Sequence, residues 1–128
     1  MIDIDLLEKY EAVRKLYKKT EIIFEKDHLA THYYQIVSGA VKMNNFNDEG
    51  REFIQGIFYK DQSFGEPPLF IDECYPATAV AFQDSKIVKL SKDKFLKILD
   101  EYPSIQKNFL NLMAHRIHSK AKTSKDII

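Results

Sequence analysis

The hydrophobic pattern of the chain changes its period twice, and this constrains the fold more than any other feature. Between about residues 20 and 90 the apolar residues lie in short runs rich in Val, Ile, Phe and Tyr, as they do in β-strands. On either side of this segment they recur every three or four positions, as on one face of a helix. The sequence therefore predicts a mainly β domain with flanking helices.

Turn signals divide the central segment into short runs. They include Ser38-Gly39, Asn47-Asp48-Glu49-Gly50, Asp61-Gln62 and Pro67-Pro68. The runs predicted to form strands are residues 21–24, 33–37, 40–46, 51–58, 77–82 and 86–90. Several short strands with regular turns are typical of an antiparallel sandwich, barrel or roll. We predict a β-roll over residues 20–90.

The flanking segments predict an N-terminal helix, a short helix and a long C-terminal helix. Asp3 or Asp5 caps the first of these helices, and Ser91 caps the second. Pro103 suits the first turn of the last helix. The predicted helices cover residues 1–19, 91–100 and 103–122.

The apolar face of the last helix is longer than one end of a small β domain needs. Such a face often pairs with a copy of itself, so we predict a homodimer through the C-terminal helix. The predicted dimer residues are Phe109, Leu112, Met113, Arg116 and Ile117. The alternative is that the whole stripe packs on its own β domain.

Composition limits the class of protein. The chain has 128 residues, enough for one domain. Its 19 Lys and Arg balance 19 Asp and Glu, which argues against a surface built as a whole to bind nucleic acid or an anionic membrane. Neither a signal peptide nor an apolar run of about 18 residues is evident, so we expect a cytoplasmic protein that does not enter a membrane.

Residues with catalytic or metal-binding chemistry are sparse. The one cysteine, Cys74, follows two acidic residues, which do not activate a thiol. His115 and His118 are three apart on a predicted helix, but no third metal ligand is evident nearby. The other histidines, His28 and His32, share one loop. The sequence therefore predicts no enzyme, no catalytic residues and no metal site.

A basic cluster closes the last helix. It consists of Arg116, Lys120, Lys122 and Lys125. Cations at a helix C-terminus complement the helix dipole, and this interpretation is favoured over an approach to DNA phosphates.

The segment from Phe64 to Ala81 stands apart. Gly65-Glu66 follows a strand, a few residues that can form one helical turn come next, and the run Ala77-Thr78-Ala79-Val80-Ala81 returns. Exposed amides at the start of such a turn suit an anion. Glu66 can accept hydrogen bonds from a sugar hydroxyl.

These features together resemble the cyclic nucleotide-binding domain, and more narrowly the sensor domain of Crp/Fnr-type bacterial transcription regulators. The resemblance covers about residues 18–120. It rests on Phe24-Glu25-Lys26-Asp27, on the run from Tyr34 to Lys42 with its Ser-Gly turn, on Asp48-Glu49-Gly50-Arg51-Glu52, and on the two ends of the segment just described, which match the family's phosphate-binding cassette.

The resemblance implies a double-stranded β-helix, a jelly-roll-like β-roll, whose last helix is a dimer helix. In the family this helix leads into a DNA-binding domain, which is absent from this chain, so DNA contact is expected only through that missing part. The apolar pair Ile127-Ile128 at the terminus also suggests a chain cut inside a longer protein. The resemblance assigns ligand binding to Gly65, Glu66, Tyr75, Ala77 and Thr78.

The cassette departs from the family pattern in its cation. Family members that bind cyclic AMP or GMP carry an arginine that pairs with the phosphate, and the matching position here is Tyr75. Pro67, Pro68 and Pro76 lack the N–H groups that would face an anion. The hypothesis is that the fold is kept and the ordinary ligand is lost. The effector is then another small molecule of unknown identity, or the domain is a scaffold without ligand, and no cofactor is assigned.

Three alternatives stay open. One keeps a cyclic nucleotide as effector, with an arginine from outside the cassette. Another is a metal-binding or enzymatic barrel of the cupin type, but the strands between 40 and 90 carry no histidine. The third is a regulatory domain of a channel or kinase.

Overall fold

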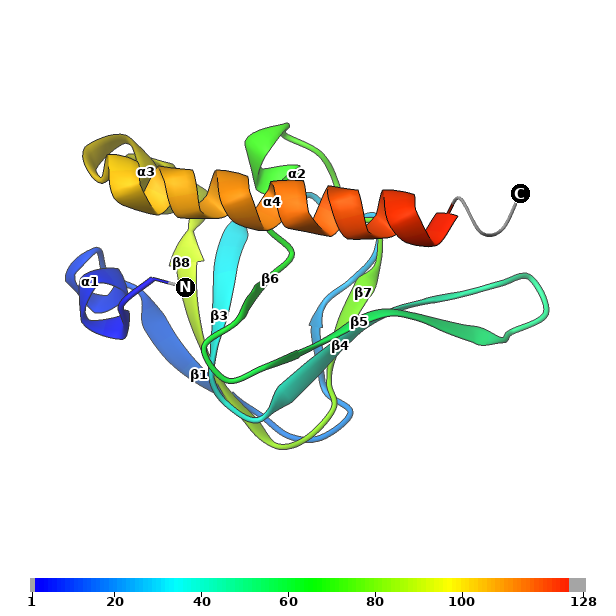
Figure 1. The fold of residues 1–128 in the computed structure, drawn as a ribbon. Coiled ribbons are helices and arrows are strands. Elements are labelled where there is room, and N and C mark those ends of the chain that lie inside the picture. Colours follow the sequence, from blue (N-terminus) through cyan, green and yellow to red (C-terminus); the bar gives the residue numbers. More distant parts are fainter. Residues whose placement is uncertain (1, 125–128) are drawn as a thin grey trace. The chain divides into compact units, whose positions relative to one another are not determined.

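The computed structural model describes residues 2–124, with side chains through Lys122. In this range short strands lie between helices at both ends of the chain (Figure 1). The elements are α1 (Ile4–Lys9), β1 (Val13–Tyr17), β2 (Ile22–Phe24), β3 (His32–Ser38), β4 (Ala40–Phe46), β5 (Glu52–Tyr59), β6 (Ser63–Phe64), α2 (Pro67–Phe70), β7 (Thr78–Ala81), β8 (Ser85–Ser91), α3 (Lys92–Glu101) and α4 (Pro103–Ser124).

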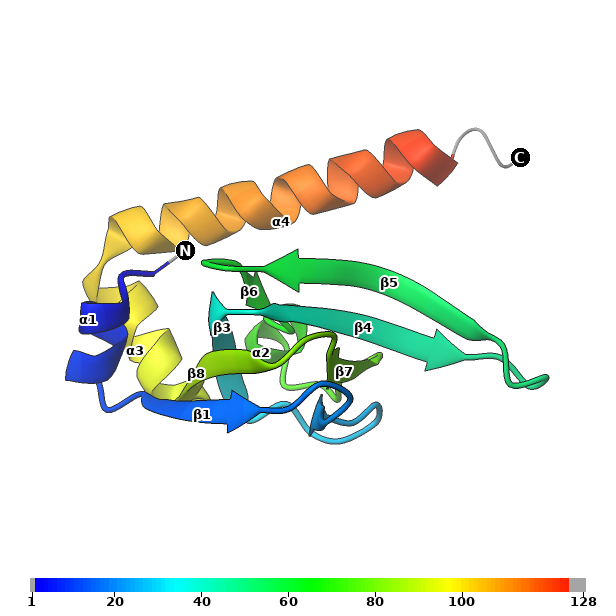
Figure 2. The same ribbon diagram turned by 90° about the horizontal axis from the view of Figure 1, so that it is seen from below.

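The strands form two antiparallel four-stranded sheets. The first sheet has the order β1-β8-β3-β6 and the second sheet has the order β2-β7-β4-β5 (Figure 2). Each sheet thus joins strands from both ends of the β segment, which is the arrangement of a jelly roll. The predicted fold class, a jelly-roll-like β-roll with flanking helices, is confirmed.

The chain divides into two compact units, and the boundary falls between Phe95 and Leu96, within α3. The first unit contains both sheets. Its core is built from the inward-facing residues of the strands, which are every second residue because successive side chains point to opposite faces of a sheet. Tyr33 of β3 is fully buried, and its ring stacks on that of Phe95 with centroids 4.5 Å apart.

The prediction of one N-terminal helix over residues 1–19 was wrong beyond Lys9. Asp3 caps α1 by accepting a hydrogen bond from Asp5 N at 2.8 Å. The helix ends at Lys9, and Glu11 then adopts a φ of 73° that turns the chain. Val13–Tyr17 next pairs with β8 as an edge strand. The β-roll therefore starts at Val13. The apolar residues of this segment match the spacing of a helix only in part, and backbone pairing with β8 makes the segment a strand.

Gly39 makes the tight connection between β3 and β4. Its φ is 97°, a conformation that side chains with a Cβ rarely adopt. A Cβ at this position would lie 2.6 Å from the carbonyl oxygen of Asp84 and 2.7 Å from Cα of Ser85. The Ser85 hydroxyl also exchanges hydrogen bonds with the backbone of Ala40. Glycine is thus required both by the backbone conformation and by the neighbouring chain.

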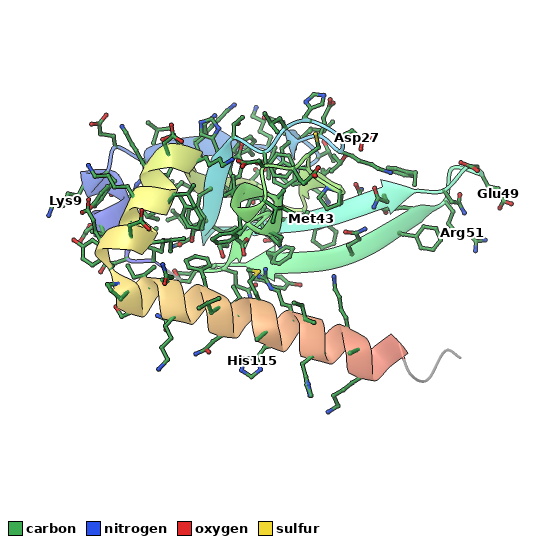
Figure 3. All side chains as sticks on the ribbon, turned by 90° about the horizontal axis from the view of Figure 1, so that it is seen from above. Lys9, Asp27, Met43, Glu49, Arg51 and His115 are labelled. Atoms are coloured by element: carbon green, nitrogen blue, oxygen red, sulfur yellow. The ribbon has the colours of Figure 1, made fainter. Side chains whose placement is uncertain are left out.

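The β4–β5 hairpin extends past the other strands of its sheet (Figure 2). Asn47 closes its tip, because its Oδ1 accepts hydrogen bonds from Glu49 N and Arg51 N at 3.0 and 2.8 Å. Glu49 and Arg51 lie at this tip (Figure 3). Gly50 supplies a positive φ of 82°, with no atom within 4 Å of where a Cβ would stand.

The second unit contains the remainder of α3 and the long helix α4. Tyr102 separates the two helices, and its amide donates to the Ile98 carbonyl at 2.9 Å. Pro103 opens α4, where its missing N–H has no helical partner to lose. Within residues 2–124, no helix combines the length and the apolar character that crossing a membrane requires.

Candidate functional site

The cassette begins at a sharp corner between β6 and α2. Gly65 has a φ of 75°, and a Cβ there would stand 2.8 Å from the Phe24 ring and 3.4 Å from the Tyr75 ring. The corner is therefore closed from within by two aromatic side chains, one of which belongs to a strand far away in the sequence. Glu66 follows Gly65, and Pro67 and Pro68 then start α2.

Glu66 lies between Gly65 and Pro67, and its side chain is fully buried. Its backbone carbonyl accepts a hydrogen bond from Leu69 N at 2.9 Å, within the turn of α2. Burial, and then the negative charge of Glu66, raise the pKa of Tyr33 well above its usual range. The carboxylate thus lies among interior groups, so a ligand hydroxyl can contact it only after neighbouring side chains move.

Tyr75 is turned inward. Its side chain is only 3% exposed, and its ring stacks on that of Phe24 with centroids 3.7 Å apart and planes 10° from parallel. Its hydroxyl donates to the His32 carbonyl at 3.3 Å. Burial raises the pKa of Tyr75 to about 12. At neutral pH this position therefore offers an uncharged phenol.

The backbone around Tyr75 is held as firmly as its ring. Its N–H donates to the His28 carbonyl at 2.9 Å, and its own carbonyl accepts from Asp27 N at 2.8 Å. Asp27, labelled in Figure 3, has a φ of 71° and lies in the loop after β2. Two hydrogen bonds and a ring stack therefore fix Tyr75 against the segment that carries Phe24.

Four aromatic rings fill the roll beside Gly65, and we call them the aromatic cluster: Phe24, Tyr34, Phe64 and Tyr75. All four are buried. Ring centroids are 5.6 Å apart for Phe24–Tyr34 and for Tyr34–Phe64, and 6.0 Å apart for Phe24–Phe64. These are ordinary packing distances for aromatic side chains. The cluster carries no positive charge with which an anion could pair.

Two of the predicted ligand residues, Ala77 and Thr78, lie where the chain enters the return strand β7, and they differ in burial. Ala77 is fully buried, as are Ala79 and Ala81. Thr78 and Val80 alternate with them and are half-buried, so they lie on the opposite face of the strand. The Thr78 hydroxyl accepts a hydrogen bond from Lys26 N at 3.0 Å. The structure therefore brings Gly65 and Tyr75 together, with Glu66 and Ala77 in the interior, and places Thr78 on the outer face.

The sequence did not point to the partners of Tyr75. Phe24, Tyr34 and Phe64 belong to separate strands, and in the sequence they differ in no way from other core aromatics. One signal was available, namely the absence of an arginine in the cassette. Without a charged side chain at this position, an aromatic ring can fold inward. Met43 of β4, which is also buried and is labelled in Figure 3, likewise belongs to the inward face.

The predicted dimer residues lie on α4. Ile117 is 69% exposed, and Leu112, Met113 and Arg116 are half-buried, whereas Phe109 is buried. Leu110 and Ile117 are both exposed, and with Ala114 and Ala121 they form a stripe at intervals of four, three and four residues. We call these four residues the α4 stripe. Lys125, Ile127 and Ile128, which the sequence analysis discussed, lie outside the described residues.

Metal-ligand chemistry is sparse in the part of the chain that the structure describes. Residues 2–124 hold no group of three or more His, Cys, Asp or Glu side chains able to bind a metal ion. Cys74 is exposed in the loop before β7. His32 is partly buried, and burial, followed by the charge of Lys89, lowers its pKa.

An antiparallel jelly roll with a Gly-Glu corner, a one-turn helix and a buried return strand defines the class of β-roll sensor domains. A family model for the cyclic nucleotide-binding domain matches residues 14–102, and the chain belongs to this family.

Several of the known relatives are Crp-type regulators. The chain is 27% identical to the cyclic AMP receptor protein of Thermus thermophilus over 90% of this chain and 53% of that protein. The crystal structure of the catabolite activator protein of Thermus thermophilus superposes with a TM-score of 0.85 at 27% identity, over 97% of this chain and 57% of the other. The chain spans about half the length of the curated regulators it matches.

A sensor domain alone is also similar. The sensor domain of the transcriptional regulator DNR from Pseudomonas aeruginosa superposes with a TM-score of 0.76 at 25% identity, over 91% of this chain and 77% of the other. The chain is therefore a cyclic nucleotide-binding domain homologous to the sensor domains of Crp/Fnr regulators, as the sequence predicted.

Proposed function

We propose that this chain is the effector-sensing and dimerisation part of a cytoplasmic transcription regulator and that its cassette does not hold the phosphate of a cyclic nucleotide. The observation that carries the second statement is the stack of Tyr75 on Phe24 against Gly65. A neutral, buried ring stands where the family's arginine would pair with the phosphate. The effector is then a different small molecule, or the domain acts without one.

The energetics favour this proposal. Loss of the charged partner of a buried anion costs about 2–5 kcal/mol. This weakens binding by roughly thirtyfold to a few thousandfold. Pro67, Pro68 and Pro76 offer no N–H to an anion, which removes further hydrogen bonds at about 1 kcal/mol each. A micromolar site would thereby become millimolar or weaker.

Titration with cyclic AMP and cyclic GMP tests the proposal. At ~1 mM nucleotide we expect a rise of less than about 2 °C in Tm, because a ligand near its Kd adds only ~0.4 kcal/mol. Calorimetry should give a Kd above about 1 mM. The Thermus thermophilus cyclic AMP receptor protein, measured alongside, is the positive control. A micromolar Kd for this chain would show that another group holds the phosphate and would overturn the proposal.

We propose that two copies of the chain dimerise through α4. Two helices that place an apolar stripe against each other bury it in a coiled-coil seam, and Ile117 belongs both to the predicted dimer face and to the α4 stripe. The wider regulatory scheme follows from it: an effector would change the relation of two such helices, and DNA-binding domains beyond this chain would follow.

Replacing Ile117 with aspartate should therefore separate the dimer. A charge placed in a coiled-coil seam is expected to weaken self-association by at least about thirtyfold, which sedimentation equilibrium measures directly. His115→Asp is the matched control, since His115 is exposed and, two residues before Ile117, lies on another face of the helix. Figure 3 labels His115 on α4. A dimer that survives Ile117→Asp unchanged would place the interface elsewhere.

A further inference from the structure

The outer face of the second sheet carries a groove that is separate from the cassette interior. Its volume is about 610 Å³. Apolar walls come from Ile22, Phe46, Val80 and Phe82, all of which are half-buried or exposed. The groove therefore presents contiguous apolar surface on the side of β4 and β7 that faces away from the aromatic cluster.

The polar part of the groove beside Asn44 contains an ion pair. Lys42 Nζ lies 2.9 Å from the Glu52 carboxylate and 5.7 Å from the centroid of the Phe82 ring. The hydrogen bond from Lys42, and next that from Asn44, lower the pKa of Glu52. Because the cation and the carboxylate neutralise each other, this pair adds no net charge beside Asn44, and a ligand group that contacts it is favoured when it is neutral. The exposed residue Lys19 also lines the groove.

Asn44 points to the kind of neutral ligand. Its side chain is only 5% exposed, and its Nδ2 donates to Glu52 Oε2 at 2.6 Å. This contact sets the orientation of the amide, because a carboxylate accepts hydrogen bonds and cannot donate them. Asn44 Oδ1, among the described residues, has no hydrogen-bond partner although it is buried. A buried acceptor of this kind calls for a donor.

Thr78 stands beside Asn44. The two residues are register partners across β7 and β4, so their side chains are neighbours on the same face. The Thr78 hydroxyl accepts from Lys26 N and keeps its own hydrogen for donation. The pair thus places an acceptor, Asn44 Oδ1, next to a donor, the Thr78 hydroxyl.

We propose that this groove binds a small, neutral, planar cyclic amide, a lactam, beside Asn44 and Thr78. The lactam N–H donates to Asn44 Oδ1, and its adjacent carbonyl accepts from the Thr78 hydroxyl. The flat ring packs on the aromatic and aliphatic walls, of which Ile22, Phe46 and Phe82 are exposed and Val80 is half-buried. This site shares the strand β7 with the cassette but uses the outward face of that strand, opposite the buried residues Ala79 and Ala81.

The experiment titrates 2-oxindole, a planar lactam, into the ¹⁵N-labelled 128-residue chain and follows backbone amide signals by NMR. We expect the largest changes in β4 and β7, around Asn44 and Thr78. The N-methylated analogue cannot donate to Asn44 Oδ1 and should bind about tenfold more weakly, as expected for the loss of one hydrogen bond to a buried acceptor.

Two variants complete the test. Val80→Phe fills the groove and should abolish the shifts, whereas Leu16→Phe should leave them unchanged, because Leu16 is 72% exposed on β1 of the other sheet. The spectrum of each variant reports directly whether it has folded, and the comparison of the two compounds needs no substitution. The proposal is overturned if β4 and β7 do not respond, if the two compounds bind equally well, or if folded Val80→Phe still binds.

Discussion

Gly39→Ala is expected to lower the free energy of unfolding by about 3 kcal/mol or more. A residue with a Cβ at this positive φ is strained by about 1–2 kcal/mol. The added methyl group would also meet the carbonyl oxygen of Asp84 and Cα of Ser85 within 2.7 Å, and overpacking against atoms that cannot rotate away adds about 1–3 kcal/mol. Urea unfolding monitored by circular dichroism measures the loss.

Gly50→Ala is the matched control. Gly50 also lies in a turn between paired strands, with a φ of 82°, but nothing stands within 4 Å of the position of a Cβ. Its substitution should therefore reveal the backbone strain alone, about 1–2 kcal/mol. The difference between the two variants isolates the contact with β8. Equal losses would mean that the chain at Ser85 shifts easily and that Gly39 is needed only for its backbone conformation.

Phe24→Ala is expected to destabilise the first unit by about 3–5 kcal/mol, the usual range for removing a buried phenylalanine ring. Phe24 contacts three other rings of the aromatic cluster and lies against Gly65. Its loss leaves a cavity at the centre of the cassette and removes the stacking partner of Tyr75. Chemical denaturation gives the size of the effect, and near-ultraviolet circular dichroism reports the loss of ring packing.

Phe53→Ala serves for comparison, because Phe53 is 53% exposed on β5 and its removal should cost less than about 1 kcal/mol. A loss at Phe24 as small as that at Phe53 would show that the cluster is loosely packed. It would then offer room for a ligand, contrary to the proposal that Tyr75 and Phe24 close the cassette.

Local pattern was enough to predict most of the β-roll. Alternation and turn residues marked the strands now seen as β2, β3, β4, β5, β7 and β8. β6 escaped, because a two-residue strand has no period to detect. Residues 13–17 were misassigned for a different reason: their spacing is compatible with a helix, and only pairing with β8, far along the chain, makes them a strand.

The candidate site was predictable in its chemistry but not in its geometry. The absence of an arginine and the presence of prolines are visible in the sequence, and they led to the expectation of a lost anion site. The inward stack of Tyr75 depends on Phe24, on the loop at Asp27 and on the corner at Gly65, which meet only in the folded chain. Likewise, the groove at Asn44 and Thr78 exists only because β4 and β7 are neighbours.

The order of strands has a consequence for synthesis. Among the described strands β1 pairs only with β8, and β2 pairs only with β7, so after β1 and β2 leave the ribosome they have no partner until nearly the whole roll has been made. At ~5–20 residues per second this interval lasts several seconds. During that time Val13–Tyr17 and Ile22–Phe24 remain unpaired edges, which are templates for pairing with other nascent chains. Because long-range strand pairs dominate this fold, we expect folding on the millisecond-to-second scale. The unpaired edges are exposed during synthesis, so the protein should gain more from chaperones that bind an emerging chain than from those that refold a finished one.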